Sequence, residues 1–278
     1  MQIFTSKTEL SAYLSTLPKE QIIGFTPTMG ALHDGHLSLI TASNKKCDIT
    51  ICSIFVNPTQ FNNKEDLVNY PNTLNADLAL LKKVNCDIAY APQFSDMYNN
   101  GEMVKKYNFG DIATTMEGKY RPGHFNGMAT IVEKFFTLIK PSIAFFGQKD
   151  LQQLQIVKAL VKQIKTAPEI ISVPTKREES GLAKSSRNKL LSNFDKQQAA
   201  LLYKCLVYCK NNKNQGIAKL KKYICKTISS NKNFELEYVE FVALKNMQAI
   251  QYWEEKDENA ICIAAYISGV RLIDNIIL

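Results

Sequence analysis

Two of the three histidines in this chain of 278 residues lie three positions apart, at His33 and His36 in the segment PTMGALHDGH. This spacing puts both imidazoles on one face of a helix start. Gly30 and Gly35 allow tight turns and the close approach of a ligand to the backbone. Amides at a helix N-terminus favour a phosphate group, and imidazoles beside it can donate to phosphate oxygens as charge develops. The segment therefore indicates a phosphate site; the alternative is a histidine pair satisfied by local hydrogen bonds.

Two neutral amides, Asn57 and Gln60, follow a run of β-branched and apolar residues from Ile49 to Val56. Amide groups beyond a buried strand suit the hydroxyls or the carboxylate of a small ligand. An ordinary Asn-Pro turn explains the same residues equally well. From the residues alone, a ligand site and a plain turn are both open here.

A third polar group follows the apolar run from Ile143 to Phe146. Lys149 and Asp150 open a predicted helix there, and Gln153 lies one turn further on. A lysine in this place can neutralise phosphate charge. Asp150 can instead act simply as the cap of the helix, which is the structural alternative.

The sequence KSSRN at 184–188 places a lysine, two hydroxyls and an arginine in a predicted loop. These groups suit a polyphosphate, and a basic loop can close over a site and exclude water. The alternative is a solvated surface loop. The segment EGKYRPGHF at 117–125 holds His124, the third histidine, for which we expect a structural role.

Strand-like and helix-like runs alternate through the first half of the chain. The predicted strands are 21–25, 49–56, 86–90, 143–146 and 170–173, and the predicted helices are 37–44, 74–83, 128–139 and 151–163. This alternation predicts a parallel sheet with right-handed crossovers. Functional groups of such sheets lie beyond the carboxyl ends of the strands, which is where the first three polar segments are expected.

The pattern changes after Pro174. Helices are predicted at 192–208 and 218–229, followed by strands at 235–244, 260–267 and 271–277. We therefore predict an α/β protein with two closely joined domains. A Rossmann-like domain with a parallel sheet is expected over residues 1–175, and a smaller α+β domain acting as a lid over residues 176–278.

The composition is that of a globular protein, with 45% hydrophobic and 22% charged residues. It excludes a mainly disordered chain. The apolar run at 260–267 is too short to cross a bilayer, which takes roughly twenty residues. The N-terminus has no basic region followed by an apolar run, so we expect no secretory signal. A cytoplasmic protein without a membrane partner is the expectation.

Seven cysteines without a C-x-x-C pair are typical of reduced, mostly buried thiols rather than of a disulfide framework or a metal site. The net charge is +8, and the segment from Tyr203 to Lys232 carries eight lysines and no acid. A basic face can bind nucleic acid or other anions, but no aromatic-interleaved stripe accompanies it. We interpret the segment as a solvated surface and expect no nucleic-acid partner.

Taken together, the motifs resemble one enzyme family. HDGH at 33–36 and the later KSSRN loop are similar to the HIGH and KMSKS motifs of the nucleotidyltransferase superfamily. The set PTMGALHDGH, FVNPTQF, RPGHFNG, FFGQKDLQQL and KSSRN stands in this order, and SGVRLIDN follows at 268–275. This set resembles the pantoate–β-alanine ligases (pantothenate synthetases) over nearly the whole chain.

The resemblance implies a reaction and its substrates. Members of the family join (R)-pantoate to β-alanine while ATP is cleaved to AMP and pyrophosphate. The pantoate carboxylate attacks the α-phosphorus of ATP, and the amine of β-alanine then attacks the pantoyl adenylate. The family needs Mg²⁺, carried mainly by the nucleotide phosphates, and its members are commonly homodimers.

Motif matching also implies roles for single residues. His36 is the expected proton donor, Gln60 is expected to reach both acids, and Asp77 is a candidate water-mediated ligand of Mg²⁺. The expected catalytic set is His33, His36, Lys149, Ser185, Ser186 and Arg187. The residues expected to bind pantoate and β-alanine are Gln60, Gln153, Asn57 and Met29. Those expected to bind ATP are Pro27, Met29, Gly30, His33, Gly35, His36, Gly147, Lys149, Asp150, Lys176, Lys184, Ser185, Ser186 and Arg187.

The chain departs from the family pattern at position 184, where Lys184 replaces the apolar residue of many members. The lysine either adds a phosphate contact or changes the packing of the loop. Two other functions fit parts of the sequence. A nucleotidylyltransferase acting on a phosphorylated acceptor shares H-x-G-H but leaves Gln60 and Gln153 unexplained. An RNA-binding relative of the class I aminoacyl-tRNA synthetases would use the lysine-rich segment, yet no long anticodon-binding region is present.

Overall fold

The computed structural model describes residues 1–166 and 168–278, which form two compact units. The first unit comprises residues 1–109, 121–148 and 156–173, and the second comprises residues 110–120, 149–155 and 174–278. The sequence predicted a single division after residue 175. It carried no signal that the two short segments 110–120 and 149–155 pack with the C-terminal part of the chain.

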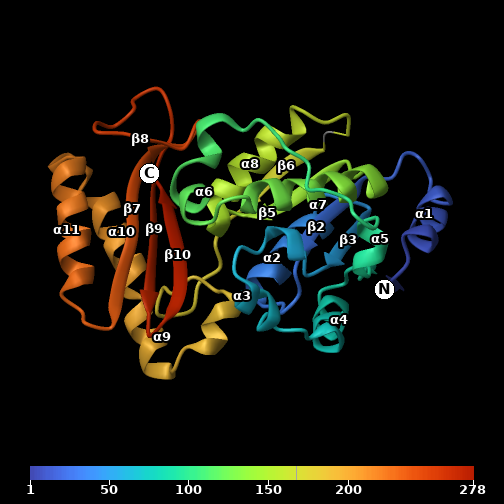
Figure 1. Ribbon diagram of the computed structural model, residues 1–278, viewed down its shortest axis with the longest axis horizontal. Coiled ribbons are helices and arrows are strands. Elements are labelled where there is room, and N and C mark those ends of the chain that lie inside the picture. The colour runs from blue at the N-terminus through green and yellow to red at the C-terminus, as the bar shows by residue number, and fades with distance from the viewer. Residues whose placement is uncertain (167) are drawn as a thin grey trace. The chain divides into compact units, whose positions relative to one another are not determined.

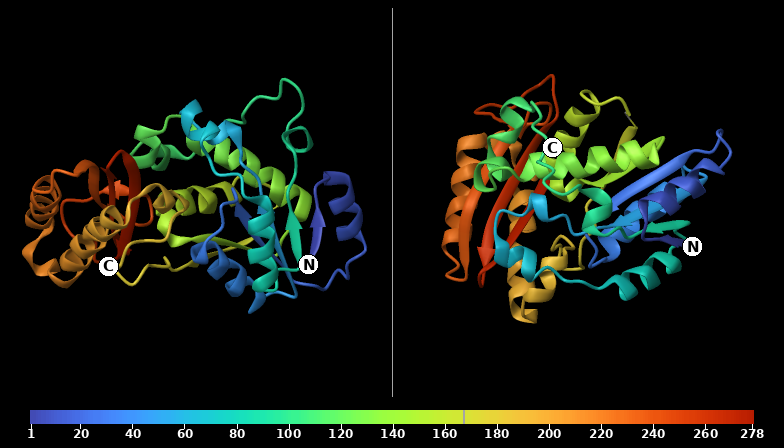
Figure 2. Two further views of the ribbon diagram at one scale, coloured as in Figure 1. Left: turned by 90° about the horizontal axis from the view of Figure 1, so that it is seen from below. Right: turned by 45° about the vertical axis from the view of Figure 1, so that its right-hand side comes forward.

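The first unit is built on a six-stranded parallel sheet with the order β1-β4-β3-β2-β5-β6 (Figure 1). Its strands are β1 (Gln2–Phe4), β2 (Ile23–Thr28), β3 (Ile49–Ile54), β4 (Ile88–Tyr90), β5 (Ile143–Gly147) and β6 (Glu169–Val173). β1 lies beside β4 at one edge, as the left view of Figure 2 shows. The strand order reverses between the neighbours β2 and β5. The carboxyl ends of strands at such a reversal form the ligand crevice of open α/β sheets.

Helices cover both faces of this sheet. The helical segments of the first half are α1 (Lys7–Ser15), α2 (Asp34–Asn44), η1 (Pro58–Gln60), α3 (Lys64–Val68), α4 (Leu74–Lys83), α5 (Phe94–Met97) and α7 (His124–Ile139), and α8 (Leu151–Val161) follows β5. Ile40 of α2 and Leu81 of α4 pack in one cluster with Ala89. The ring of Phe135, on α7, lies 6.1 Å from that of Tyr90. Because successive strand residues point to opposite faces, α7 covers the face opposite to α2 and α4.

The second unit contains a four-stranded antiparallel sheet with the order β10-β9-β7-β8. Its strands are β7 (Phe234–Ala243), β8 (Gln248–Ala249), β9 (Asn259–Ile267) and β10 (Val270–Ile277). The longer helices are α9 (Asn193–Ala199), α10 (Leu201–Asn211) and α11 (Ile217–Ser229), and the short segments are η2 (Gly110–Ala113), α6 (Met116–Tyr120), η3 (Gln148–Asp150), η4 (Ser186–Leu190) and η5 (Lys213–Gln215).

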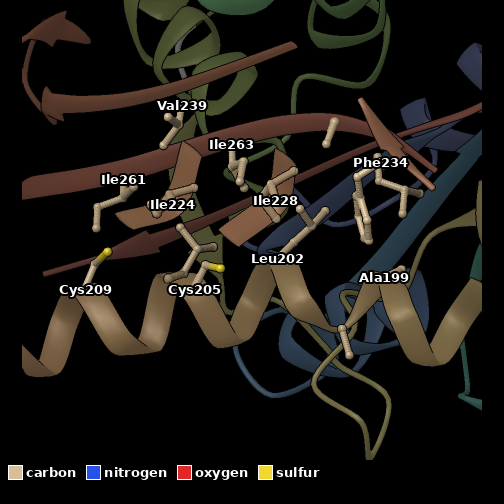
Figure 3. Packing of buried hydrophobic residues seen from close by; sticks show 14 of the residues in the cluster. Ala199, Leu202, Cys205, Cys209, Ile224, Ile228, Phe234, Val239, Ile261 and Ile263 are labelled. Carbon is tan, nitrogen blue, oxygen red and sulfur yellow. The ribbon is translucent and has the colours of Figure 1, made fainter. Parts of the chain in front are cut away.

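One face of the antiparallel sheet carries the apolar core of the second unit. Figure 3 shows Cys205 and Cys209 of α10 and Ile224 of α11 beside Val239 and Ile261 of the strands. The lysines at 219, 222 and 226 lie on the exposed side of α11. The basic segment is therefore amphipathic, with its apolar residues against the sheet and these lysines in solvent.

Arg271, on β10, forms an ion cluster with two carboxylates of the second unit. Its Nη2 lies 2.7 Å from Oε1 of Glu117, on α6, and 2.5 Å from Oε2 of Glu237, on β7. Burial lowers the pKa of the Arg271 guanidinium, but hydrogen bonds to Glu117 and Glu237 outweigh this effect and raise its pKa overall. The cluster fixes α6 to the strands, and Tyr238 reinforces it by donating from its hydroxyl to Glu117 Oε1 at 2.8 Å.

The predicted fold class is confirmed, and several boundaries differ. The helix predicted over 192–208 is two helices that meet at Ala200. α7 begins four residues earlier than predicted, directly after Gly123, whose φ of 82° sets the chain into the helix. β1 and α1 were not predicted, because a strand of three residues gives too short an alternation to recognise. No helix of the described residues is long and apolar enough to cross a membrane.

Candidate active site

A tight turn over residues 29–32 joins β2 to α2. Gly30 and Ala31 have φ values of 81° and 50°, in the left-handed region. For Ala31 this conformation is strained, since its Cβ disfavours positive φ. The carboxylate of Asp77, on α4, accepts the amide of Ala31 at 3.0 Å and that of Leu32 at 2.8 Å. Two charge-assisted hydrogen bonds to Asp77 thus fix the conformation of the turn.

The contacts of Asp77 define its role in the structure. Its side chain also accepts the hydroxyl of Thr73 at 3.2 Å, and the residue is 1% exposed. No group of three or more His, Cys, Asp or Glu side chains among residues 1–166 and 168–278 is arranged to hold a metal ion. The hydrogen bonds of Asp77 show that it positions the 29–32 turn, and its role as a water-mediated ligand of Mg²⁺ stays a prediction.

The two histidines of HDGH are held by backbone amides. His33 caps α2, and its Nδ1 accepts the amide of Gly35 at 3.1 Å. Nδ1 of His36 accepts the amide of His33 at 3.3 Å, and the ring centroids lie 4.1 Å apart. Because Nδ1 is an acceptor in both rings, the neutral form of each ring carries its proton on Nε2. In that neutral form each imidazole can donate from Nε2.

The amide of Gln60 lies beside the turn that carries Met29. Its Nε2 is 2.9 Å from the sulfur of Met29. The side chain of Asn57 is used within the protein, since it donates to Gln60 Oε1 at 3.2 Å and accepts the hydroxyl of Tyr98 at 2.9 Å. The structure thus brings Gln60 and Met29 together, whereas Asn57 orients the Gln60 side chain through a hydrogen bond to its Oε1.

His124 and Arg121 support the same residue. Nδ1 of His124 donates to the backbone carbonyl of Gln60 at 2.8 Å, and its Nε2 lies 3.2 Å from Nη1 of Arg121. Because arginine can only donate, the neutral ring carries its proton on Nδ1. A Cβ at Gly127 would lie 2.2 Å from the carbonyl oxygen of Thr59, so only glycine lets α7 approach η1 this closely. The RPGHFNG motif therefore acts by positioning Gln60.

Lys149 and Asp150 lie in the second unit. The Nζ of Lys149 is 3.6 Å from Oδ1 of Asp150, and the Lys149 side chain is 18% exposed. Asn275, on β10, donates from Nδ2 to the carbonyl of Lys149 at 2.7 Å. Gln153 is half-buried, whereas Gln152 is buried and holds α6 by accepting the amide of Glu117 at 2.9 Å.

The segment that contains KSSRN is internally braced. Ser185 caps η4, and its hydroxyl accepts the amide of Arg187 at 3.3 Å. Lys184 Nζ lies 3.4 Å from Oε2 of Glu178 in the same segment. Lys176 is exposed, and Ser186, like the other residues from 184 to 187, is half-buried. Lys184, which replaces the apolar residue of many family members, is therefore ion-paired within its own segment.

The predicted residues thus fall into two groups. Within the first unit, Met29, His33, His36 and Gln60 gather at the carboxyl ends of the paired strands β2 and β3, and Gly147 ends the neighbouring strand β5. Within the second unit lie Lys149, Asp150, Gln153, Lys176 and residues 184–187. The sequence did not reveal the supporting roles of Tyr98, Arg121 and Asn275.

The family model described as pantoate-beta-alanine ligase matches residues 2–277. The chain belongs to the pantoate–β-alanine ligase family. A pantothenate synthetase from Azobacteroides pseudotrichonymphae genomovar. CFP2 is 43% identical, with 99% of each chain covered. The crystal structure of pantothenate synthetase from Thermus thermophilus is similar with a TM-score of 0.92 at 35% identity, and 99% of each chain is covered.

A second solved relative bears on the substrates. The pantoate-beta-alanine ligase from Francisella tularensis, complexed with beta-gamma ATP and beta-alanine, is similar with a TM-score of 0.83 at 38% identity, and 99% of this chain and 97% of that one are covered. The family establishes the reaction of this ligase: ATP-dependent condensation of (R)-pantoate with β-alanine through pantoyl adenylate, with release of AMP and pyrophosphate. This finding replaces the nucleotidylyltransferase and RNA-binding alternatives.

Proposed function

We propose that His33 and His36 stabilise the charge that develops on the phosphates of ATP during adenylyl transfer. The observation that carries the proposal is the hydrogen bond from a backbone amide to Nδ1 of each ring, which leaves the proton of the neutral ring on Nε2. The nucleophile is the carboxylate of pantoate, so the protein contributes position and charge neutralisation rather than a nucleophile of its own. His36 acts as the proton donor, and His33 contacts phosphate beside it.

Gln60 is the proposed ligand of pantoate and, in the second step, of β-alanine. Its amide offers both a donor and an acceptor, which suits a hydroxy acid. Gln153 and Met29 complete the pantoate contacts, and Asn57 acts through its hydrogen bond to Gln60. The acyl adenylate hydrolyses easily, so the site must exclude water while the intermediate waits for the amine.

The remaining proposed contacts are with ATP. Lys149 and Arg187 neutralise phosphate charge, and Asp150 lies on the ribose side. The backbone glycines and the hydroxyls of the KSSRN loop surround the nucleotide. The proposed ATP ligands are Pro27, Met29, Gly30, His33, Gly35, His36, Gly147, Lys149, Asp150, Lys176, Lys184, Ser185, Ser186 and Arg187.

Mg²⁺ is proposed to arrive with ATP, held by the phosphate oxygens. Magnesium in such sites keeps several waters and takes few protein ligands, so a dedicated protein cage is not needed. No step of the proposed mechanism depends on Asp77 as a ligand. A homodimer is a further proposal that rests on the family resemblance, and light scattering of the purified enzyme measures it directly. A cytoplasmic location is also proposed.

The overall reaction is tested by AMP release with ATP, Mg²⁺, pantoate and β-alanine, omitting each acid in turn. AMP formed only with both acids, and a product with the mass of pantothenate, is the expected result. ATP consumption that needs neither acid, or no turnover with both, contradicts it.

The role of His36 is tested by His36→Ala in pantoate-dependent exchange of pyrophosphate into ATP, which isolates adenylate formation. The exchange rate is expected to fall by roughly 10²–10⁴. Thr41→Ala is a matched control, because Thr41 is an exposed residue of the same helix α2. A fall of less than about threefold in a folded His36→Ala enzyme removes His36 from the catalytic set.

A further inference from the structure

The segment that precedes KSSRN folds back on itself as a hairpin over residues 176–184, with a bridge between Arg177 and Ala183. Arg177 holds it together. Its Cζ lies 3.6 Å from the centroid of the Tyr203 ring, and its Nη1 donates to the carbonyl of Gly181 at 3.0 Å. The guanidinium therefore ties the start of the hairpin to its turn and packs the hairpin against Tyr203 of α10.

Arg177 is also paired with Asp274, on β10. Nη1 and Nη2 donate to the two carboxylate oxygens at 2.7 and 2.9 Å. The side chain of Asp274 is 3% exposed and that of Arg177 is 17% exposed. Burial raises the pKa of Asp274, and the hydrogen bonds from Arg177 oppose that rise. A bidentate pair fixes direction as well as distance, so the hairpin has one orientation on the strand.

The next residue of the same strand holds the turn that carries Lys149. Asn275 is 3% exposed and donates from Nδ2 to the Lys149 carbonyl at 2.7 Å. Successive residues of a strand point to opposite faces, so Asp274 serves the hairpin on one side and Asn275 serves the Lys149 turn on the other. β10 pairs with β9 along its whole length, which gives both residues a rigid base.

We propose that Arg177, Asp274 and Asn275 are positioning residues for adenylyl transfer. They fix the spacing between the Lys149 turn and the KSSRN loop, acting through the backbone of both. The inference rests on the proposed function, in which both segments contact ATP. A shift of about 1 Å in a charged group can cost on the order of 10²-fold in rate, so a spacing set by two buried side chains matters for the chemistry.

Asn275→Ala and Asn275→Asp test the link to Lys149. The first removes the donor, and the second sets a carboxylate oxygen against the carbonyl. The rate of pantoate-dependent pyrophosphate exchange is expected to fall by about 10- to 100-fold. The half-saturating ATP concentration should rise by at least about fivefold while that of pantoate stays within about twofold, because the ATP contacts alone are displaced. Glu240→Gln, in the partly exposed Lys221–Glu240 pair of the same unit, is the control and should leave the rate unchanged.

Asp274→Asn tests the link to the hairpin. Limited trypsin cleavage at Arg187 and Lys189 should become faster, and the exchange rate should fall. Arg177→Lys keeps the charge but loses the planar fork, so both readouts should be intermediate. Asn275→Ala should leave the cleavage rate unchanged, because only the backbone carbonyl of Asn275 contacts the hairpin, accepting from Arg177 Nη2 at 3.4 Å, and the substitution keeps that carbonyl.

Lys149→Ala separates the failure of this inference from that of the proposed function. If Lys149→Ala lowers the exchange rate but both folded Asn275 variants stay within about twofold of the parent, the positioning role alone is overturned. An equal rise in half-saturation for ATP and pantoate also overturns it, because that is general loosening. If Lys149→Ala leaves the rate unchanged, the proposed role of Lys149 fails and the inference fails with it.

Discussion

The two units fix their functional residues by different means. In the first unit, hydrogen bonds without an ion pair hold the site: Asn57 and His124 orient Gln60, and the Asp77 carboxylate accepts two backbone amides of the 29–32 turn. In the second unit, guanidinium–carboxylate pairs hold the segments that carry the site. Arg177 pairs with Asp274, and Arg271 pairs with Glu117 and Glu237.

The difference follows from the two kinds of sheet. Parallel strands bring their carboxyl ends to one edge, so the site residues already lie near one another and single hydrogen bonds are enough to orient them. The antiparallel sheet offers no such edge. Arg271 reaches from β10 to Glu117 on α6, and Arg177 reaches from the 176–184 hairpin to Asp274 on β10. Removing one partner of a buried ion pair is costly, because it leaves the other charge without compensation.

The largest effect is expected at the ion cluster. Arg271→Leu leaves the carboxylates of Glu117 and Glu237 facing each other with side chains 10% and 11% exposed. The free energy of unfolding should fall by about 3–5 kcal/mol, measured by urea denaturation. Lys221→Met breaks a more exposed pair and should cost less than about 1 kcal/mol. Equal losses of unfolding free energy in the two variants would contradict the larger contribution to stability that we expect from the Arg271 cluster.

A smaller effect is expected at Asp77. Asp77→Asn replaces one acceptor by an amide donor that faces a backbone N–H, which should cost about 1–3 kcal/mol of stability. The strained turn should also move, so pyrophosphate exchange should slow by at least about tenfold. Asp87→Asn is the control, because Asp87 accepts the amide of Thr50 at 2.8 Å but is exposed. An unchanged exchange rate in folded Asp77→Asn would separate the turn from the chemistry.

Alkaline pH should weaken both units alike, because each buries thiols. Burial raises the pKa of Cys86 in the first unit and of Cys209 in the second to about 12. The unfolded chain releases these protons near pH 9 while the folded chain keeps them. The thiols therefore cost no stability well below pH 9, where both states keep the protons. As pH rises from 9 towards 12, the free energy of unfolding falls by up to about 1.4 kcal/mol per pH unit for each thiol.

Urea midpoints at pH 8, 9 and 10 measure this slope. Cys209→Ala should flatten it even though the smaller side chain lowers stability at every pH. Cys225→Ala, at a half-buried position of α11, serves as the comparison. A slope unchanged by Cys209→Ala would show that other groups cause the alkaline loss.

The smallest effect is expected at Lys184. Its Nζ is already paired with Glu178, so Lys184→Met should change turnover by less than about tenfold. The AMP-release assay measures this directly. A larger loss would show that the proposed contact of this lysine with ATP contributes strongly to turnover despite its ion pair with Glu178.

The sequence was sufficient where the determinants are local. The histidine pair, its glycines and the helix that it caps lie within a few residues, and the strand ends that carry Gln60 and Lys149 follow from hydrophobic patterns. It was not sufficient where partners are distant. Asp77 and Ala31 are 46 residues apart, and Arg177 and Asp274 are 97 apart.

Such pairs leave no trace in periodicity or composition. The family resemblance proposed Asp77 as a water-mediated ligand of Mg²⁺, but no sequence pattern showed that its carboxylate accepts the amides of Ala31 and Leu32. In the same way, nothing in KSSRN shows that Lys184 pairs with Glu178, because ion pairing is decided by the path of the hairpin. The sequence was enough to propose candidate catalytic side chains, whereas the residues that hold them in place needed the fold.

The fixed imidazole protons turn the histidines into built-in spectroscopic reporters. The chain has three histidines, so a sample labelled with ¹⁵N in its histidine rings gives three ring spin systems. At neutral ring charge, His33 and His36 should show a proton on Nε2, and His124 should show it on Nδ1. Titration with ATP should move the first two signals through direct contact, while His124 would report how far Gln60 shifts when pantoate binds.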